Sequence, residues 1–357
     1  MVRMPAAILC AAISILAISS IAQGAERRDR ELPARQPNQV AGNEITPEQK
    51  EAVARGLAYL ATRQQPNGSF VYSSSQGHAG ITALAGIAFM SAGNLPGRGM
   101  YGKNVQKILD YLLANTQESG LITSDQAHGA MYGHGFATVF LSEIYGMGGD
   151  DEVKEKLRKA VRLLQKTQNQ EGGWRYQPVP YDADISVTIC SVMGLRAARD
   201  AGIKVEKDTI DRAVGYVRRC QNPDGGFSYV AGQGSGSGFA RSAAGVATLF
   251  YAGQYEGQDL TRGLKYLKAV KPGTGMGEEE SYFFYGHYYA SQAMFLAGGE
   301  YWSGYYPAIR DVLIRRQDKT SGRWSGEAGD DYATAMALII LQMPNRYLPV
   351  FHGKGAE

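Results

Sequence analysis

Apolar residues recur along this chain in two alternating patterns. Residues 52–60, 105–112 and 161–164 place apolar side chains at helical spacing among charged ones, which predicts amphipathic helices. A glycine-containing turn follows each segment, and then comes a run that is rich in alanine and apolar nearly all round. Helices of this second kind belong inside a fold, whereas mixed helices belong outside. The chain is therefore predicted to alternate between outer and inner helices.

The alternation divides the chain into six copies of one repeat. Their common reference positions, spaced 52, 52, 53, 50 and 47 residues apart, are Tyr59, Tyr111, Leu163, Tyr216, Tyr266 and Leu313. Nine residues later each copy has glycine, and eleven residues later five of the six have a large apolar residue. The inner helices are predicted at 81–92, 136–145, 185–201, 240–255, 288–297 and 332–342. Regular self-similarity of this period predicts stacked helix pairs.

Six helix pairs form either an open solenoid or a closed ring. A solenoid needs polar terminal repeats, because its end faces are exposed to water. Here the last inner helix carries the apolar run 338–341, so we expect it to pack against the first repeat near 81–89. The sequence therefore predicts an all-α fold, an (α/α)6 toroid of six helix-pair repeats.

Composition excludes some partners and leaves others open. Lys and Arg together number 37 against 34 Asp and Glu, and this near balance gives no electrostatic footprint for nucleic acid. The mature chain keeps Cys190 and Cys220, which permit one bridge but which we interpret as two buried thiols. We predict no cofactor, no metal and a monomer.

The N-terminus resembles an export signal. Residues 1–24 combine an early Arg3, an apolar run and small residues at a cleavage site, which predicts a cleaved signal peptide and a secreted or periplasmic protein. A retained anchor helix is the alternative, although the run is short for a membrane span. Residues 25–45 are predicted to be a flexible leader, and 46–357 the toroid. Thr46 should cap the first helix, with Pro47 at its first position and Gln49 completing a capping box.

Three repeats share a motif that is similar to the QW motif of squalene and terpenoid cyclases and of protein prenyltransferase β-subunits. The first copy is Arg55-Gly56-Leu57-Ala58-Tyr59-Leu60 followed by Gln65, Gly68 and Phe70; the others end in Gln168, Gly172 and Trp174 and in Gln221, Gly225 and Phe227. The resemblance covers residues 46–350. It implies that these Gln and aromatic side chains join neighbouring outer helices, so we interpret Trp174 and Trp324 as packing residues.

Two further comparisons with those families concern chemistry. Asp182-Ala183-Asp184-Ile185 resembles the acidic motif with which squalene-hopene-type cyclases protonate an alkene, except that Ile185 replaces the third Asp. The resemblance implies Asp184 as the proton donor. The zinc ligands of protein prenyltransferases are not matched, because no Asp-x-Cys pair occurs in the chain.

The starts of the inner helices carry a second set of candidates. Counting back four residues from a Thr or Ser in each inner helix gives five titratable side chains and one glycine: His78, His134, Asp184, Gly238, His287 and Asp330. A closed ring would bring these positions to one rim, where His134 is expected beside Asp184, and His78 beside Asp330 or Asp331. Adjacent His and Asp suit proton transfer. The alternative is that the Asp and Gly residues only cap helices.

The fifth repeat contains the most aromatic window of the chain, residues 282–289. We expect Tyr285, Tyr288 and Phe136 to line a central cavity below the rim, with Arg241 as a further ligand-binding candidate. Aromatic walls suit an isoprenoid-like lipid, a glycan or a peptide. Two functions therefore stay open: acid–base catalysis at the His/Asp rim, of cyclase, lyase or hydrolase type, or a non-catalytic binding or interaction scaffold. Residues 232–238, rich in glycine, are predicted to be a flexible loop over the fourth repeat.

Overall fold

The computed structural model describes residues 44–353 except 73–76, 125–128 and 274–277, all in the compact unit Ala34–Glu357. The predicted signal peptide and nearly all of the leader lie outside these residues. The described helices, with no strand among them, are α2 (Pro47–Arg63), α3 (Ala79–Ser91), α4 (Gly102–Ala114), α5 (Ala130–Gly146), α6 (Asp151–Thr167), α7 (Ile185–Asp200), α8 (Lys207–Arg219), α9 (Phe239–Tyr251), α10 (Gln258–Lys268), α11 (Glu278–Ser281), α12 (Phe283–Ala297), α13 (Gly299–Arg316) and α14 (Asp330–Gln342), followed by the 3-10 helices η1 (Met343–Asn345) and η2 (Pro349–Phe351).

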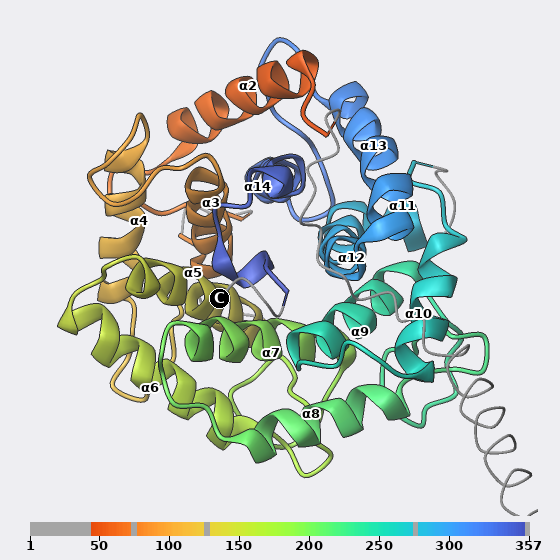
Figure 1. Cartoon of the computed structure of the whole chain (residues 1–357). Helices are drawn as coiled ribbons and strands as arrows, with labels where there is room; N and C mark the ends of the chain where they lie inside the picture. Colours follow the sequence, from red (N-terminus) through yellow and green to blue (C-terminus); the bar gives the residue numbers. More distant parts are fainter. Residues whose placement is uncertain (1–43, 73–76, 125–128, 274–277, 354–357) are drawn as a thin grey trace, which may run out of the picture. The chain divides into compact units, whose positions relative to one another are not determined.

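Helices α3, α5, α7, α9, α12 and α14 form an inner ring, and α2, α4, α6, α8, α10 and α13 surround it (Figure 1). The layers follow the sequence pattern. Every residue of α3 is buried, whereas α6 buries only one face, which includes Val153, Leu157 and Leu164. Exposing a helix without a polar face to water is unfavourable, so such a helix occupies the inside of the ring. The predicted all-α toroid is confirmed.

Successive outer helices are joined by a glutamine side chain. The amide of Gln168 donates to the carbonyl of Gly172 in its own turn, at 2.9 Å, and to that of Thr209 in the first turn of α8, at 2.8 Å. Gln221 makes the same pair of bonds to its own turn and to α10. Each amide therefore bonds one carbonyl on either side of a repeat boundary and links the two repeats.

The glutamine of the first repeat is Gln64, one residue before the predicted one. Its amide donates to the carbonyls of Gly68 and Asn104, at 3.1 and 3.0 Å. Gln65 instead donates its amide to the nearby carbonyl of Arg63. The assignment of Gln65 to this role was wrong by one position: Gln64, like Gln168 and Gln221, stands four residues before the repeated glycine.

The repeated glycine lets two backbones approach closely. Gly172 has a φ of +97°, and a Cβ atom there would lie 2.2 Å from the carbonyl oxygen of Arg212 in the next outer helix. Side chains larger than hydrogen are therefore excluded both by the backbone conformation and by space. Gly68, Gly120 and Gly225 meet the next outer helix in the same way.

The same glutamine contact closes the ring between the sixth repeat and the first. Gln317 donates to the carbonyls of Gly322 and of Ala52 in α2, both at 2.9 Å. Inside, α14 lies between α12 and α3 (Figure 1), and Gln342 donates to the carbonyl of Ala88 at 3.0 Å. The predicted packing of the last inner helix against the first repeat is confirmed.

The start of the first helix is partly as predicted. The Thr46 hydroxyl accepts from the backbone N–H of Gln49 at 3.2 Å, and Pro47 occupies the first turn. The Gln49 side chain does not complete a capping box. Its amide instead donates to the carbonyl of Leu341 in α14, so this residue also serves ring closure.

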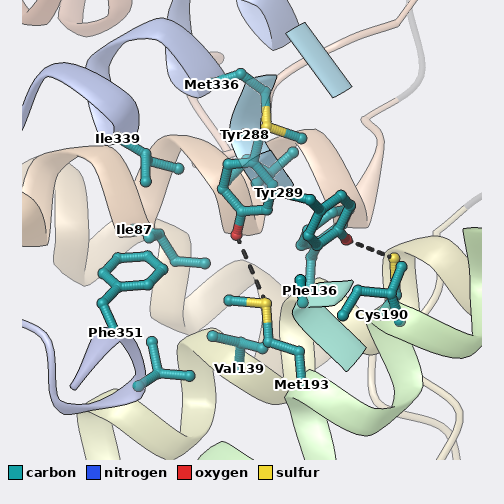
Figure 2. Close-up of a cluster of buried hydrophobic side chains, with 14 of the residues drawn as sticks. Ile87, Phe136, Val139, Cys190, Met193, Tyr288, Tyr289, Met336, Ile339 and Phe351 are labelled. Atoms are coloured by element: carbon teal, nitrogen blue, oxygen red, sulfur yellow. Dashed lines mark hydrogen bonds between the residues drawn. The ribbon is translucent and has the colours of Figure 1, made fainter. Parts of the chain in front are cut away.

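The middle of the inner ring is filled by side chains (Figure 2). Five inner helices and η2 contribute to this core, with Ile87, Phe136, Val139, Cys190, Met193, Tyr288, Tyr289, Met336, Ile339 and Phe351 among its members. Phe136 and Tyr288 pack edge to face, with their ring centres 6.0 Å apart. The central cavity expected beneath the rim is therefore occupied by packed side chains at these residues. Cys190 and Cys220 are buried free thiols, as predicted.

The chain after α14 covers the C-terminal ends of the inner helices. Leu348, Val350 and Phe351 are buried there, and η2 contacts α5 and α7. The backbone N–H of Val350 donates to Glu143 Oε1 at 3.1 Å. Burial raises the pKa of Glu143 to about 8, with the nearby Asp200 adding to the rise and the Val350 hydrogen bond opposing it.

Glu143 predicts a specific dependence of stability on pH. Between about pH 4.5 and 8 the unfolded chain releases the proton that folded Glu143 keeps, so the free energy of unfolding falls as pH rises. The loss is at most about 1.4 kcal/mol per pH unit. Glu143→Gln retains an acceptor for Val350 but cannot ionise. Urea unfolding at several pH values should therefore show a flatter profile for this variant; an unchanged slope would exclude Glu143 as its source.

Candidate functional site

A pocket of about 470 Å³ lies at the N-terminal ends of α5, α7, α9 and α12. The helices contribute Tyr132, Ser186, Ala240, Arg241 and Tyr285, and the turns before them contribute Tyr176, Tyr229, Gln233, Ser235 and Tyr282. The pocket is thus at the opposite end of the inner ring from the C-terminal segment. Five of its ten lining residues are tyrosines, and only Ala240 lacks a polar side-chain atom.

Asp184 lies behind the pocket wall with a fully buried side chain. One carboxylate oxygen caps α7 by accepting from the backbone N–H groups of Ser186 and Val187, at 2.8 and 2.9 Å, and it also accepts from the Ser186 hydroxyl at 2.6 Å. The other oxygen lies 3.6 Å from Arg175 Nε. Burial raises the pKa of Asp184, although the bonds from Ser186, Val187 and the Tyr229 hydroxyl oppose the rise.

Two hydroxyl groups connect Asp184 to the pocket. Ser186 Oγ, which bonds the carboxylate, also hydrogen-bonds the Tyr132 hydroxyl, and both residues line the pocket. Burial, together with the charge of Asp184, raises the pKa of Tyr132 well above its usual range, so its hydroxyl stays protonated. The Tyr176 and Tyr229 hydroxyls are bonded to each other on the adjoining wall. A proton can therefore pass between a buried carboxyl and the pocket through hydroxyl groups.

Asp182 and Arg175 brace the loop that precedes α7. Arg175 Nη1 donates to Asp182 Oδ2 at 2.6 Å, and its guanidinium lies 5.3 Å from the centre of the Tyr176 ring. Arg175 is thus held between Asp182 and Asp184. The two carboxylates named from the acidic motif are brought together by this cation.

His134 is not on the rim, contrary to expectation. It is fully buried inside α5, where Nδ1 accepts from the backbone N–H of Ile122 at 3.1 Å and Nε2 donates to the carbonyl of Ala160 in outer helix α6 at 3.2 Å. Burial lowers the pKa of His134 to about 4, so the ring is neutral. In other repeats Thr82, Thr188 and Thr334 bond the equivalent backbone N–H.

The register error has a structural cause. Helix α5 begins at Ala130 and α12 at Phe283, five or more residues before their predicted starts. His134 and His287, which were expected at the helix starts, therefore lie one turn into their helices. His287 is accordingly buried and directed outward, with Nδ1 bonded to the Tyr305 hydroxyl of α13 at 2.7 Å. Both histidines are therefore bonded to outer helices and lie away from the rim.

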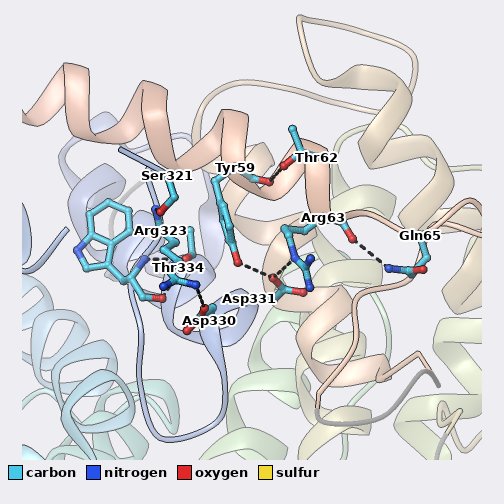
Figure 3. Close-up of polar contacts among 10 residues, drawn as sticks. Tyr59, Thr62, Arg63, Gln65, Ser321, Arg323, Asp330, Asp331 and Thr334 are labelled. Atoms are coloured by element: carbon cyan, nitrogen blue, oxygen red, sulfur yellow. Dashed lines mark hydrogen bonds and ion pairs between the residues drawn. The ribbon is translucent and has the colours of Figure 1, made fainter. Parts of the chain in front are cut away.

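The remaining rim candidates stand at the starts of the neighbouring helices α3 and α14, and none of them lines the pocket. His78 caps α3 by accepting from the backbone N–H of Ile81 at 3.3 Å. Asp330 pairs with Arg323 at 2.7 Å, and buried Asp331 accepts from Tyr59 and Arg63 of α2 at 3.3 and 3.2 Å (Figure 3). Burial raises the pKa of Asp331, an effect that Arg63 and Tyr59 oppose. These contacts join the last inner helix to the first outer helix.

Tyr285 and Arg241 line the pocket, as the sequence had suggested for ligand-contacting residues, whereas Phe136 and Tyr288 belong to the core. The sequence reasoning missed Tyr176 and Tyr229. A signal for them exists, because both stand two residues after the aromatic position of their repeats, as does Tyr72 in the first repeat. Residues 232–238, predicted to be a flexible loop, form part of the wall: Asn222 bonds Ser235 and Ser237 at 3.2 and 2.9 Å.

Comparison with known proteins agrees with the toroid fold. The family model of the squalene-hopene cyclase C-terminal domain matches residues 138–309. No curated protein sequence matches the chain significantly. The described fold is that of the α/α toroid proteins, and the predicted resemblance to squalene and terpenoid cyclases is confirmed.

Solved structures of several activities share this fold. A type II terpene cyclase from Scytonema aligns with a TM-score of 0.58, 12% identity and coverage of 84% of this chain and 99% of its own. Cellobiose 2-epimerase from Bacillus thermoamylovorans B4167 aligns with a TM-score of 0.64 and 11% identity, covering 84% of this chain and 98% of its own. An inactive α-1,6-mannanase variant from Salegentibacter sp. HEL1_6, in complex with α-1,6-mannotriose, aligns with a TM-score of 0.59 and 10% identity, covering 84% of this chain and 99% of its own. At these identities the likeness establishes the fold alone.

The described residues hold neither a cluster of metal ligands nor a membrane-spanning helix. Within the described ranges no group of three or more His, Cys, Asp or Glu residues is arranged to hold a metal ion. Across the same ranges no helix is both long and apolar enough to span a membrane.

His134 provides a test of its structural role. Replacing His134 with Ala should leave the Ile122 N–H buried without its partner, which costs about 1–3 kcal/mol in unfolding free energy. His134 should also lower the free energy of unfolding as pH drops from about 6.5 to 4, because the unfolded state gains a proton that folded His134 does not accept. Since Glu143 acts in the opposite direction over part of this range, the effect of His134 is the difference between the pH profiles of the unmodified protein and His134→Ala. Urea unfolding measures both effects. A His134→Ala variant of unchanged stability would contradict this role.

Proposed function

We propose that this protein is an exported toroid that binds a polyhydroxylated ligand, a saccharide unit of a glycan, in the pocket at the N-terminal ends of its inner helices. The observation that carries the proposal is the composition of the pocket wall: tyrosine rings alternate with hydroxyl, amide and guanidinium groups. Saccharides present apolar C–H faces beside many hydroxyls, and such a wall matches both.

The same wall disfavours an apolar ligand. An isoprenoid chain would cover the Gln233 amide in the pocket wall without offering it a hydrogen bond, and a polar group that is buried and left unpaired costs about 1–3 kcal/mol. The apolar surfaces that would suit such a chain lie in the middle of the ring, where Phe136, Tyr288 and Phe351 pack together. A glycan is therefore favoured over a lipid.

Proteins of similar fold lend support to this choice. The mannanase variant aligned above is described with a bound trisaccharide, and the epimerase is named for a disaccharide. This likeness is one of fold, so the proposal rests on the pocket itself. Export is proposed from the N-terminal signal, since a pocket for extracellular glycans is useful outside the cytoplasm.

Acid–base catalysis on the bound glycan is the second candidate function. It is favoured by the link from Asp184 through Ser186 to the Tyr132 hydroxyl. Burial raises the pKa of this carboxyl, and the hydroxyl groups give it a path by which to exchange a proton with a ligand hydroxyl. Asp184 would act as proton reservoir, and Ser186 and Tyr132 as the groups in contact with the ligand.

A pair of tyrosine variants tests the binding site. Tyr282, which lines the pocket and is 53% exposed, and Tyr72, which is 52% exposed on another repeat, can each be changed to Ala at little cost in stability. On an array of plant, fungal and bacterial polysaccharides, Tyr282→Ala should weaken binding about 2- to 10-fold. Tyr72→Ala should bind as the unmodified protein does. Equal effects of both changes, or no binding by the unmodified protein, would overturn the proposal.

Asp184→Asn separates catalysis from binding. The amide oxygen of Asn can still cap α7, so the fold and glycan binding should persist. If Asp184 supplies the proton, this variant should no longer convert the bound glycan. Mass spectrometry of the released saccharides measures the conversion. Conversion at the rate of the unmodified protein would exclude Asp184 from the chemistry, and absence of conversion in both would make the protein a binding module.

A further inference from the structure

Exposed aromatic side chains continue from the pocket onto the loop before α7. Tyr176 lines the pocket and is 36% exposed, and five residues later Tyr181 is 87% exposed. Val179, between them, is also exposed. Exposed apolar side chains that gather beside a pocket are typical of a surface that contacts a ligand or partner.

The loop is braced, so Tyr181 is held out by structure. Arg175 and Asp182 form an ion pair across its base, and the backbone N–H of Met131 donates to the carbonyl of Tyr176 at 3.1 Å. Within the loop, Val179 and Tyr181 each donate a backbone N–H to the carbonyl two residues earlier, at 2.8 and 2.9 Å. Pro178 and Pro180 further restrict the backbone.

A braced loop lowers the entropy cost of binding. A ligand that packs against Tyr181 does not have to order the loop first, so more of the contact energy appears as affinity. Tyrosine suits this role because its large ring has few rotatable bonds and a polar end that stays in water. The loop therefore has the properties of a preformed contact surface.

We propose that the 175–182 loop is a second contact region for the ligand that occupies the pocket, and that this ligand is consequently a polysaccharide chain bound over several units. The inference rests on the proposed function. Continuity carries it: Tyr176 belongs to both the pocket wall and the loop, so a chain that leaves the pocket past Tyr176 meets the exposed side chains next to it. A protein partner for the loop is the competing explanation.

Chain length discriminates between these occupants. The probes are the polysaccharide that binds best on the array and the disaccharide and hexasaccharide of the same linkage, measured by calorimetry. Tyr181→Ala should weaken binding of the polysaccharide and the hexasaccharide about 3- to 10-fold and leave disaccharide affinity unchanged. Tyr347→Ala, 56% exposed near the C-terminus, is the matched control and should change none of the three.

A second variant tests the bracing. Pro178→Ala combined with Pro180→Ala keeps Tyr181 but frees the loop, so it should weaken the two longer ligands and not the disaccharide. If the unmodified protein binds disaccharide and polysaccharide equally, or if Tyr181→Ala weakens neither long ligand, the second contact region is excluded while the pocket assignment stands. If no saccharide binds at all, the proposed function fails, and this inference with it.

Discussion

The closed ring depends on one contact between backbones, in which a glycine turn of one repeat lies against a carbonyl of the next outer helix. Gly172 at Arg212 and Gly322 at Arg55 show that this contact is the same within the chain and between its two ends. A neighbouring glutamine amide bonds both sides of the boundary. Within a repeat, the buried indoles of Trp174 and Trp324 donate to carbonyls of their own outer helices, at 2.8 and 2.7 Å. Because these contacts fix neighbouring repeats, they also fix where the inner helices begin.

The position of the pocket follows from that arrangement. Each inner helix begins at the same end of the ring, so its free N–H groups and the turns before it gather there. At the other end the C-terminal segment covers the helices, and between the ends Tyr288, Met193 and their neighbours fill the space. Polar side chains that can reach a ligand are consequently concentrated where α5, α7, α9 and α12 begin.

Periodicity predicted the fold because the repeat constrains burial at every turn of helix. It could not predict the site, because the residues that matter there depart from the repeat. The four-residue count placed His134 with His78, although its hydrogen bond to Ile122 makes it the counterpart of Thr82. An early helix start turns a side chain from the rim toward the outer helices. The 52-residue spacing of the first two repeats does align His134 with Thr82, but the four-residue count from Thr138 did not use that spacing. Asp184 was identified from its motif, while Gln233 and Ser235 required the three-dimensional path of their loop.

Ring closure by the repeated glycine contact is tested most directly by comparing Gly322→Ala with Gly202→Ala. Both glycines have nearly the same φ, +83° and +84°, so alanine pays a similar backbone strain of about 1–2 kcal/mol at each. Nothing lies near a Cβ at Gly202, whereas a Cβ at Gly322 would lie 2.5 Å from the Arg55 carbonyl oxygen of the first repeat. Urea unfolding should therefore show Gly322→Ala to be less stable than Gly202→Ala by about 1–3 kcal/mol. Equal losses in the two variants would mean that the last repeat does not meet the first through this contact, and would contradict the closed ring.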